Sequence, residues 1–393
     1  MKIIHIHNYY LQPGGEDQVF KNETRLLEEY GHEVFRYTRH NSELSGWSGV
    51  KIAINTIWNH EVYKTIDQLL NEINPDVCHI HNTFPLISPS VYFACKKHNI
   101  PVVQRLPNYR LICPGAFLLR DGKICTDCLG KRFPWPGVIH ACYRGSVAQS
   151  FVVFMMLSIH RILKTWQKKI NINVALNKYG YELFVRGGIP AEKIIISPNF
   201  VDPDPEPEPN NQPGDYALFV GRLSKEKGLN TLLDAWKMLT GIPLQIIGDG
   251  PLMTGLTERI RRENIDNVEL LGRKSHDETI AILKKARVLI FPSEWLETFG
   301  LGIIEAFAGG VPVIASKQKT IEEIVEHDVN GLLFEPGDAH DLARIIKEYW
   351  DKPEQLQEMG KEARHSFLNK YSKQQKYNSL MGIYERAIEY NKK

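Results

Sequence analysis

The sequence predicts an α/β protein built from two doubly wound domains, each organised around a parallel sheet. Three observations support this fold class. Short apolar segments alternate with helical segments in both halves, a proline-rich stretch separates the halves, and 393 residues exceed what one ordinary core accommodates. Two such Rossmann-like domains are expected to face each other across a cleft, with ligands at the carboxyl ends of the strands.

The first half is predicted to form an N-terminal domain over residues 1–196. Five apolar segments predict strands, at 2–8, 33–38, 76–82, 101–106 and 173–177. Between the first two, apolar residues recur at helical spacing and the pattern stops at a glycine: Val19, Phe20, Leu26, Leu27, Tyr30 and Gly31. This order of strand, helix and strand predicts parallel pairing.

A linker and a second domain are predicted to follow. Residues 197–214 are rich in proline and nearly devoid of apolar residues, which is typical of a linker. Six strand-like segments then predict an α/β domain over residues 215–370, namely 216–221, 244–250, 268–272, 288–293, 311–316 and 331–336. Beyond residue 339 the pattern is helical, and residues 371–393 are predicted to form a terminal helix.

Composition narrows the class of protein. A formal net charge of +2 and 24% charged residues are typical of a soluble globular protein and argue against nucleic acid as a partner. The opening MKIIHIHNYY does not resemble a secretory signal. The longest uncharged apolar stretch, 147–159, is shorter than the roughly 20 residues of a membrane-spanning helix. We therefore expect a cytoplasmic protein without a transmembrane segment.

The segment SEWLETFGLGIIEAFA follows a predicted strand and sets two acids on either side of a glycine-containing turn. The start of the helix after Gly300 would offer free backbone N–H groups to a phosphate. Glu297 could then accept hydrogen bonds from sugar hydroxyls, and Glu305, about one turn into the helix, could reach a ribose. The alternative is an ordinary strand, turn and helix with solvated acids.

A second loop, GRLSKEKG, carries Arg222 and Lys227 after another predicted strand. Two cations at the carboxyl end of a strand could neutralise a diphosphate and strengthen their contacts as charge grows on a leaving group. The alternative is a pair of exposed loop cations. The glycine-rich strand end IIGDGP, with Gly248, is a weaker indication and could be a plain turn.

Four of the six cysteines follow the pattern C-x11-C-x2-C-x13-C inside a proline- and glycine-rich insertion, 107–145. This spacing predicts a structural, four-thiolate zinc site, with unligated or redox-active thiols as the alternative. The ligands would be Cys113, Cys125, Cys128 and Cys142. Cys78 and Cys95 lie in apolar surroundings and are expected in the core.

Two further patterns have more than one interpretation. The apolar helix from 147 onward ends in basic residues, which would suit an anionic membrane interface or, alternatively, a buried helix with a basic end: Arg161, Lys164, Lys168 and Lys169. The alternating histidine pairs at 5 and 7 and at 79 and 81 could bind a metal or transfer protons, but buried, hydrogen-bonded histidines are the alternative.

The motifs GRLSKEKG, IGDGP, SEWLETFGLGIIEA, GGVPVIAS and NGLLFEPGD occur in this order over most of 196–338. Together with PGGEDQVF and HIHNTFPLISPS in the first half, they resemble family 4 retaining glycosyltransferases of the GT-B fold, of the bacterial surface-polysaccharide type. The resemblance implies transfer of a sugar from a nucleoside diphosphate, of UDP or GDP type, to a saccharide or lipid-linked saccharide acceptor. It also implies retained anomeric configuration, no catalytic metal and a terminal helix that returns to the N-terminal domain.

The resemblance also implies roles for particular residues. Arg222, Lys227 and Glu297 would be catalytic, and the donor would be bound by Gly14, Gly15, Gly221, Arg222, Lys227, Gly248, Glu297, Phe299, Gly300, Leu301 and Glu305. On the acceptor side the candidates are His81, Asn82 and Asn108. This sequence has Pro107 where similar sequences have a histidine before Asn-Tyr-Arg, and proline cannot donate a hydrogen bond. A sugar-nucleotide binding protein with weak or no transfer activity is therefore the alternative function.

Overall fold

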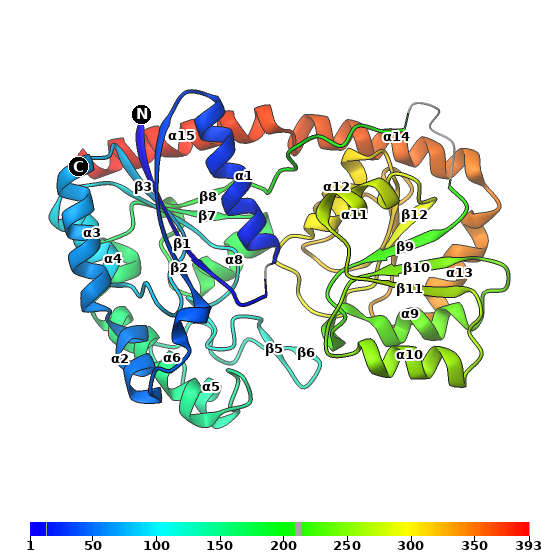
Figure 1. Ribbon diagram of the computed structural model, residues 1–393, viewed down its shortest axis with the longest axis horizontal. Helices are drawn as coiled ribbons and strands as arrows, with labels where there is room; N and C mark the ends of the chain where they lie inside the picture. Colours follow the sequence, from blue (N-terminus) through cyan, green and yellow to red (C-terminus); the bar gives the residue numbers. More distant parts are fainter. Residues whose placement is uncertain (13, 209–213, 393) are drawn as a thin grey trace. The chain divides into compact units, whose positions relative to one another are not determined.

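The computed structural model describes residues 1–12, 14–208 and 214–392. These residues fall into two compact units (Figure 1). Unit 1 comprises Met1–Asn199 together with Lys376–Lys393, and unit 2 comprises Phe200–Gln375.

Unit 1 is a doubly wound α/β unit. Its six-stranded sheet is parallel throughout, in the order β2 (Glu33–His40), β1 (Lys2–Tyr9), β3 (Val77–Asn82), β4 (Val102–Arg105), β7 (Ile172–Ala175) and β8 (Ile194–Ile196). The helices are α1 (Gly15–Glu29), α2 (Gly49–Ile57), α3 (His60–Ile73), α4 (Ser90–Lys97), α5 (Pro136–Ile139), α6 (Val147–Ile162), α7 (Thr165–Lys168) and α8 (Lys178–Arg186). All six residues of β3 are buried, as parallel strands covered on both faces require.

Unit 2 repeats the architecture with a different strand order. Its parallel sheet runs β11 (Val268–Gly272), β10 (Leu244–Ile247), β9 (Ala217–Val220), β12 (Val288–Phe291), β13 (Val313–Ser316) and β14 (Gly331–Phe334). The helices are α9 (Leu229–Trp236), α10 (Met253–Arg262), α11 (His276–Leu283), α12 (Leu301–Ala308), α13 (Ala339–Trp350) and α14 (Pro353–Lys370). The prediction of two doubly wound α/β units is therefore confirmed.

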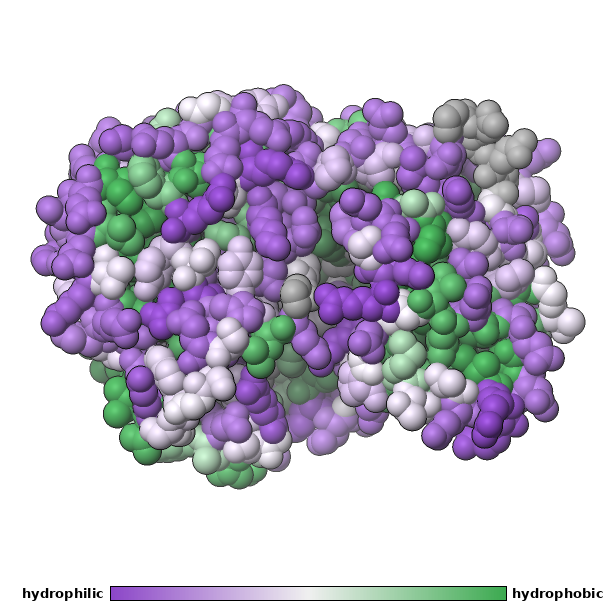
Figure 2. Space-filling view, in the orientation of Figure 1, coloured by the Kyte–Doolittle hydropathy of each residue, from purple (hydrophilic) through white to green (hydrophobic). Residues whose placement is uncertain are grey.

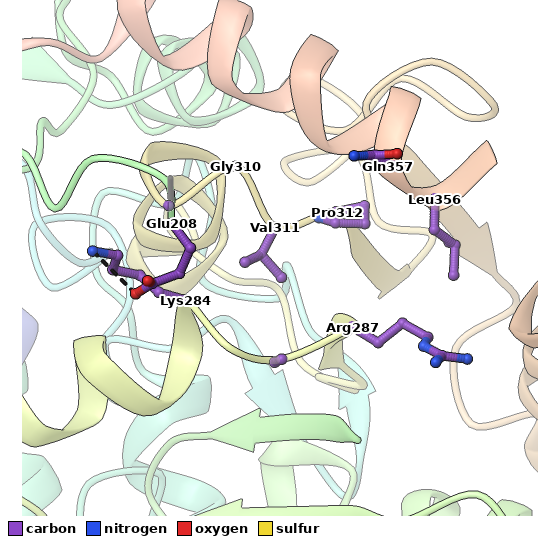
Figure 3. Close-up of a pocket in the computed structure, with 10 residues that line it drawn as sticks. Glu208, Lys284, Arg287, Gly310, Val311, Pro312, Leu356 and Gln357 are labelled. Carbon is purple, nitrogen blue, oxygen red and sulfur yellow. Dashed lines mark ion pairs between the residues drawn. The ribbon is translucent and has the colours of Figure 1, made fainter. Parts of the chain in front are cut away.

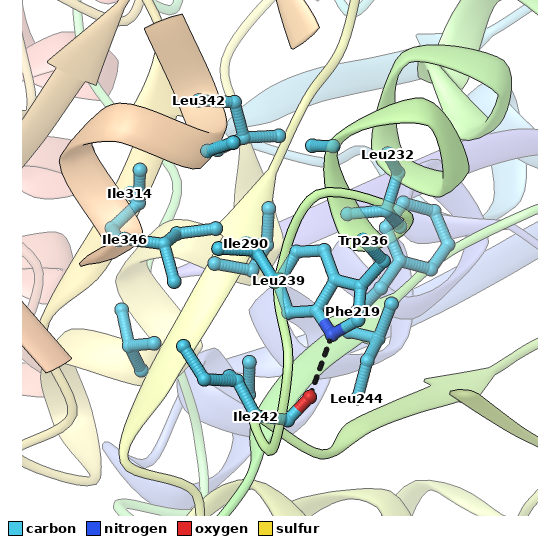
Figure 4. Packing of buried hydrophobic residues seen from close by; sticks show 14 of the residues in the cluster. Phe219, Leu232, Trp236, Leu239, Ile242, Leu244, Ile290, Ile314, Leu342 and Ile346 are labelled. Atoms are coloured by element: carbon cyan, nitrogen blue, oxygen red, sulfur yellow. Dashed lines mark hydrogen bonds between the residues drawn. The ribbon is translucent and has the colours of Figure 1, made fainter. Parts of the chain in front are cut away.

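The core of unit 2 forms between the sheet and helices α9 and α13. Trp236 lies at its centre among leucine and isoleucine side chains from these elements (Figure 4). The indole N–H donates to the backbone oxygen of Ile242 at 3.0 Å, so this large side chain is buried without leaving a polar atom unsatisfied.

Two segments differ from their sequence expectations. The stretch 197–214 was expected to be a linker, but Phe200 and Val201 are buried, and the Asp204 carboxylate pairs with Arg364 of α14 in the same unit. Residues 209–213 of this stretch lie outside the described residues. The helix expected from 147 onward is interrupted at Lys164, whose φ of +52° separates α6 from α7.

The terminal helix α15 (Lys373–Lys392) packs from residue 376 onward within unit 1. Tyr384 on this helix makes a hydrogen bond with His79 of β3 at 2.8 Å. No helix among the described residues has both the length and the apolar character needed to cross a bilayer.

Candidate functional site

The strand order of unit 2 reverses between β9 and β12. After β9 the chain adds β10 and β11 on one side of the sheet, and after β12 it adds β13 and β14 on the other. In open α/β sheets, ligands bind at the carboxyl ends of the strands that flank such a reversal. The GRLSKEKG loop follows β9, and the SEWLETFG loop follows β12. The two motifs therefore meet at the position where this topology places a ligand.

Lys227 and Glu297 are in direct contact at this reversal point. The Lys227 Nζ lies 2.6 Å from Glu297 Oε1, and the Glu297 side chain is almost fully buried. Ser293 Oγ and Trp295 Nε1 donate to the same oxygen, at 2.6 and 2.8 Å. All three donors converge on Oε1, so the second carboxylate oxygen remains available to a ligand.

The backbone holds Lys227 in this position through a glycine. Gly228 has a φ of +69°, and a Cβ at this residue would lie 1.8 Å from the backbone oxygen of Pro292. Only glycine permits both this conformation and this approach. The backbone N–H of Glu294 also donates to Glu226 at 2.9 Å, so the two loops are joined on either side of the ion pair.

Glu305 lies on α12, which begins after the left-handed Gly300 (φ +99°). Burial raises the pKa of its carboxyl to about 7. Within the described residues, this side chain has no hydrogen-bond or ion-pair partner. A partly buried carboxyl without a partner is costly unless a ligand supplies donors.

The remaining donor-side candidates of unit 2 surround this pair of loops. Arg222 is exposed, and its guanidinium has no partner within the described residues. The loops at Gly221 and Gly248 lie against each other, because Gly221 donates to Ile247 at the end of the neighbouring strand. Leu301 is the first residue of α12. The Phe299 ring is buried against Tyr371, so only its backbone could reach a ligand.

A different pocket of unit 2 lies at the opposite end of the strands, beside their amino ends (Figure 3). It encloses about 30 Å³ beside the segments that lead into β12 and β13, and Lys284 pairs there with Glu208 at 3.4 Å. Because it faces the amino ends of the strands, it is separate from the Lys227 and Glu297 site.

Unit 1 has its own reversal in strand order, between β1 and β3. Gly14 caps α1, Gly15 begins it, and both are exposed. Asp17 fixes this loop, since one of its oxygens accepts from the Gly14 N–H at 3.1 Å and the other lies 2.7 Å from His7 Nε2. The loop is thus tied to the end of β1.

The acceptor-side candidates line one cavity of unit 1. It has a volume of about 40 Å³ and its wall includes His81, Asn82, Pro107 and Asn108. The Asn82 amide donates to Asn8, and Asn108 accepts from the Arg110 backbone, so both amides have structural partners.

His5, His79 and His81 form the one group among the described residues whose metal-ligating atoms all lie within 4.8 Å of one another. Burial lowers the pKa of His5 to about 3 and that of His81 to about 4. His5 makes a hydrogen bond with Thr24 at 2.9 Å, and His79 with Tyr384. His5 and His79 are therefore the buried, hydrogen-bonded histidines of the alternative interpretation, and His81 is buried beside Glu23.

The neighbours of this histidine group disfavour a divalent cation. Glu23 lies 3.2 Å from His81, but it also pairs with Arg105 at 2.6 Å and Lys376 at 3.0 Å. Burial alone would raise the pKa of Glu23, but the two cations hold it well below its usual range. The single carboxylate is thus already shared by two buried positive charges.

The four cysteines of the 107–145 insertion converge in space, but loosely. Burial raises the pKa of Cys128 to about 12, and the nearby thiols of Cys113, Cys142 and Cys125 contribute to this increase. In the part of the chain that is described, no three of these sulfurs come within 4.8 Å of one another. Cys78 and Cys95 are buried in the core.

Sequence reasoning did not identify Ser293, Trp295 and Gln318 as site residues. Gln318 accepts from the Glu297 backbone at 3.3 Å and donates to Ser293. For Ser293 and Trp295, the one indication in the sequence is that they lie close to Glu297. Gln318 follows β13, so its approach depends on the pairing of β12 with β13.

Comparison with known proteins shows which family unit 2 resembles. Residues 201–366 match the family described as glycosyl transferases group 1. Similar curated proteins include an uncharacterised glycosyltransferase of Methanocaldococcus jannaschii, 34% identical over 44% of this chain and 49% of its own length. The D-rhamnosyltransferase WbpZ of Pseudomonas aeruginosa is 33% identical over 38% of this chain and 39% of its length. The chain thus spans half or less of these relatives.

Solved structures resemble the whole chain in fold. HepE of Anabaena, solved in complex with UDP and glucose, has a TM-score of 0.70 at 19% identity and covers 97% of this chain and 98% of its own. Sucrose-phosphate synthase of Thermosynechococcus elongatus has a TM-score of 0.72 at 15% identity, covering 98% of each chain. These structures share the fold of the whole chain, whereas the match to the group 1 glycosyl transferases covers residues 201–366, which make up most of unit 2.

Proposed function

We propose that this protein is a retaining glycosyltransferase that moves a sugar from a nucleoside diphosphate to an acceptor hydroxyl. The observation that carries the proposal is the arrangement after β9 and β12. Lys227 contacts Glu297, while the carboxyl of Glu305 has no partner among the described residues. A sugar nucleotide offers hydroxyls at both ends of its diphosphate, which suits two carboxylates on either side of a cation and a helix N-terminus.

In this proposal Glu305 accepts from the ribose, Lys227 and Arg222 neutralise the diphosphate, and Glu297 accepts from the donor sugar. The hydrogen bonds from Lys227, Ser293 and Trp295 stabilise the charge of the Glu297 carboxylate and so lower its nucleophilicity. This supports a step in which the acceptor oxygen bonds to the anomeric carbon as the diphosphate leaves. The departing phosphate oxygen takes the acceptor proton on the same face, which requires no catalytic metal.

The names of relatives support a role in cell-surface polysaccharide or glycolipid synthesis. WbpZ is named a rhamnosyltransferase, and a further relative in Escherichia coli is named an O-antigen chain mannosyltransferase. HepE was solved with UDP. We therefore propose a UDP- or GDP-sugar as donor and a saccharide or lipid-linked saccharide as acceptor, used at the inner face of a membrane.

The test is nucleoside diphosphate release from a panel of UDP-, GDP- and other activated sugars, with and without lipid extract as acceptor. We expect release from one donor class that rises when acceptor is added. Tight binding of a sugar nucleotide without any release would contradict transfer and support a binding protein.

Pro107 favours that second candidate function. It lines the same cavity as His81 and Asn108, in the position where the family has a hydrogen-bond donor. His81 cannot replace that donor without rearrangement, because it is 1% exposed and its ring faces Glu23. If the protein is a silenced enzyme, Pro107→His will restore diphosphate release. If it is active, the same change will leave donor choice unaltered.

We also propose that the cysteine-rich insertion binds a structural zinc ion. Its backbone contacts support convergence of the four ligands. Cys125 donates to Leu118, Cys142 donates to Gly137, and Cys128 Sγ lies 3.7 Å from the Pro134 oxygen. Gly115 lies two residues after Cys113 in the sequence, and a Cβ at Gly115 would lie 3.5 Å from the Cβ of Cys142. The segment with Cys113 therefore lies close to Cys142. Zinc would draw these thiolates closer than they lie here.

Charge also suits this zinc proposal. Residues 107–146 contain six lysines and arginines and two aspartates, so the net charge of a zinc tetrathiolate, −2, would be compensated locally. Elemental analysis of the purified chain should find about one zinc per molecule, lost in Cys125→Ser with Cys128→Ser and kept in Cys78→Ala. A folded protein without zinc, and with all four thiols reactive, would refute the site.

A further inference from the structure

Helix α6 presents an apolar face to solvent, which is unusual for a surface helix. Val147, Phe151 and Ile162 lie on one side of it and are 57%, 50% and 52% exposed. Phe151 also stacks on Phe154 at 5.9 Å between ring centroids. No charged residue occurs from 147 to 159. Surface helices normally carry polar residues on such a face.

Neighbouring elements extend this apolar surface. Helix α2 packs against α6 and exposes Val50 (70%) and Ile54 (61%), while α5 also packs against α6 and exposes Ile139 (64%). Trp135, just before α5, is 51% exposed. Figure 2 shows hydrophobic side chains gathered over this region, where Figure 1 places α2, α5 and α6. These four residues with Val147, Phe151 and Ile162 are called the apolar face of unit 1.

The segments that carry the apolar face are rich in basic residues. Residues 44–60 and 128–181, which include α2, α5 and α6, contain nine lysines and arginines and no aspartate or glutamate. The whole chain, by contrast, has a formal net charge of only +2. Several cations lie over aromatic rings here, with Lys51 4.0 Å from the Trp47 centroid and Lys131 5.2 Å from that of Trp135.

The basic residues predicted at the end of α6 do not supply the positive charge beside the apolar face. Arg161 turns inward, and its guanidinium donates to the backbone oxygens of Leu111 and Lys131. His160 is also buried, and it contacts the backbone of Ile57 at the end of α2. The cations that could face a partner therefore come from α2 and from the segments that flank α5.

We infer that the apolar face of unit 1 docks on an anionic lipid bilayer. Exposed apolar side chains would enter the boundary of the acyl chains, tryptophan would lie at the level of the headgroups, and the surrounding lysines and arginines would meet lipid phosphates. The cations on α2 and beside α5 are Lys51, Lys131, Arg132 and Arg144, and a second copy of this chain would bring the same positive charges and be repelled. Charge complementarity therefore selects the anionic membrane.

Docking through the apolar face of unit 1 would also place the acceptor cavity near lipid. This inference rests on the proposed function. Met156, on the buried side of α6, lines the cavity with Pro107 and Asn108. A lipid-linked saccharide held in the bilayer beneath α6 would need to reach only across this one helix.

The test is sedimentation of the full-length protein with vesicles, measured without sugar nucleotide so that its outcome is independent of catalysis. Neutral phosphatidylcholine vesicles are compared with vesicles that contain one quarter phosphatidylglycerol. We expect at least tenfold tighter binding to the anionic vesicles, weakened by high salt. Replacing Ile139, Val147 and Phe151 by serine should reduce this binding tenfold or more, and Lys131→Glu with Arg132→Glu should remove the preference for anionic lipid.

The matched control replaces exposed apolar residues of unit 2, Val329→Ser with Leu368→Ser, which are 38% and 45% exposed. It should bind vesicles like the unmodified protein, and circular dichroism should show that all variants are folded. Trp135→Phe should also abolish the part of tryptophan fluorescence that brominated lipid quenches. Equal binding by the serine variant and the control would overturn the proposal. So would a dimer in solution that the serine variant alone disrupts.

Discussion

At the scale of single residues, the candidate donor site depends on how two carboxylates are surrounded. Glu297 is held by three donors at one oxygen, whereas Glu305 has no partner among the described residues. The first is a fixed acceptor for a ligand, and the second is a group that a ligand must satisfy. This difference gives each residue a separate test.

Glu305→Gln should change how stability depends on pH. The pKa of Glu305 is raised from 4.5 to about 7. Between these values the folded state retains a proton that the unfolded state has released, so this group lowers stability as pH rises through the window. Glutamine cannot ionise. The variant should therefore melt at the same temperature as the natural protein at pH 4.5 and at a higher temperature at pH 8. A constant difference at both pH values would place the carboxyl in water.

Lys227→Met should lower the turnover number by about 100-fold or more. One charge-assisted contact to a leaving diphosphate contributes about 1.5 to 3 kcal/mol. The variant also leaves Glu297 without its cation. Lys225→Met is the matched control, since Lys225 is exposed in the same turn. The measurement is the rate of diphosphate release at saturating donor. Equal rates in the two variants would remove Lys227 from the mechanism.

Much of the site could be predicted at this scale, and the reason is local. Arg222, Lys227 and Glu297 follow predicted strands closely, and Glu305 lies on the helix that comes next, so strand order alone could bring them together. Trp295 and Ser293 could not be assigned, because their role depends on which oxygen of Glu297 they reach. Sequence spacing carries no information about that geometry.

At the scale of elements, the turn into α12 determines where a phosphate could lie. Gly300→Ala should destabilise the protein by about 1 to 2 kcal/mol, because φ at this residue is +99° and a Cβ would crowd Ile303 at 3.1 Å. Gly302→Ala is the matched control. Its Cβ would meet nothing within 4 Å, so stability should be unchanged or slightly raised.

These two alanine variants also test the ligand. Urea unfolding measures their stability, and calorimetry measures their affinity for nucleoside diphosphate. A methyl group at Gly302 should weaken nucleotide binding even though it costs no stability, because it would occupy the space of an approaching phosphate. Unaltered affinity in Gly302→Ala would place the phosphate elsewhere.

The strands were predicted well because long apolar segments between helical patterns are unambiguous. β8 was missed, since three isoleucines at Ile194–Ile196 are too short a run to distinguish from a loop. The small hairpin of β5 (Leu119–Arg120) and β6 (Lys123–Ile124) was also missed, because it has two residues in each strand.

At the scale of the whole molecule, residues far apart in sequence stabilise unit 1. Glu23, Arg105 and Lys376 come from α1, β4 and α15, and all three are buried. No sequence pattern predicted this contact, because the terminal helix has to fold back before the third member arrives. It explains how α15 is held within unit 1.

Glu23→Gln should destabilise the protein by about 3 to 5 kcal/mol, because two buried cations would lose the one carboxylate that pairs with them among the described residues. Glu358→Gln removes an exposed partner of Lys361 and should cost less than about 1 kcal/mol. Urea unfolding measures both changes. A small effect of Glu23→Gln would mean that water reaches Arg105 and Lys376.

We propose above all that a nucleoside diphosphate binds where the strand order of unit 2 reverses. The most direct measurement is calorimetric titration of the natural protein, and of the double variant Lys227→Met with Glu305→Gln, with UDP and GDP. We expect saturable, one-to-one binding of one of these nucleotides by the natural protein and at least 100-fold weaker binding by the folded double variant. Equal affinity in the two proteins would contradict it.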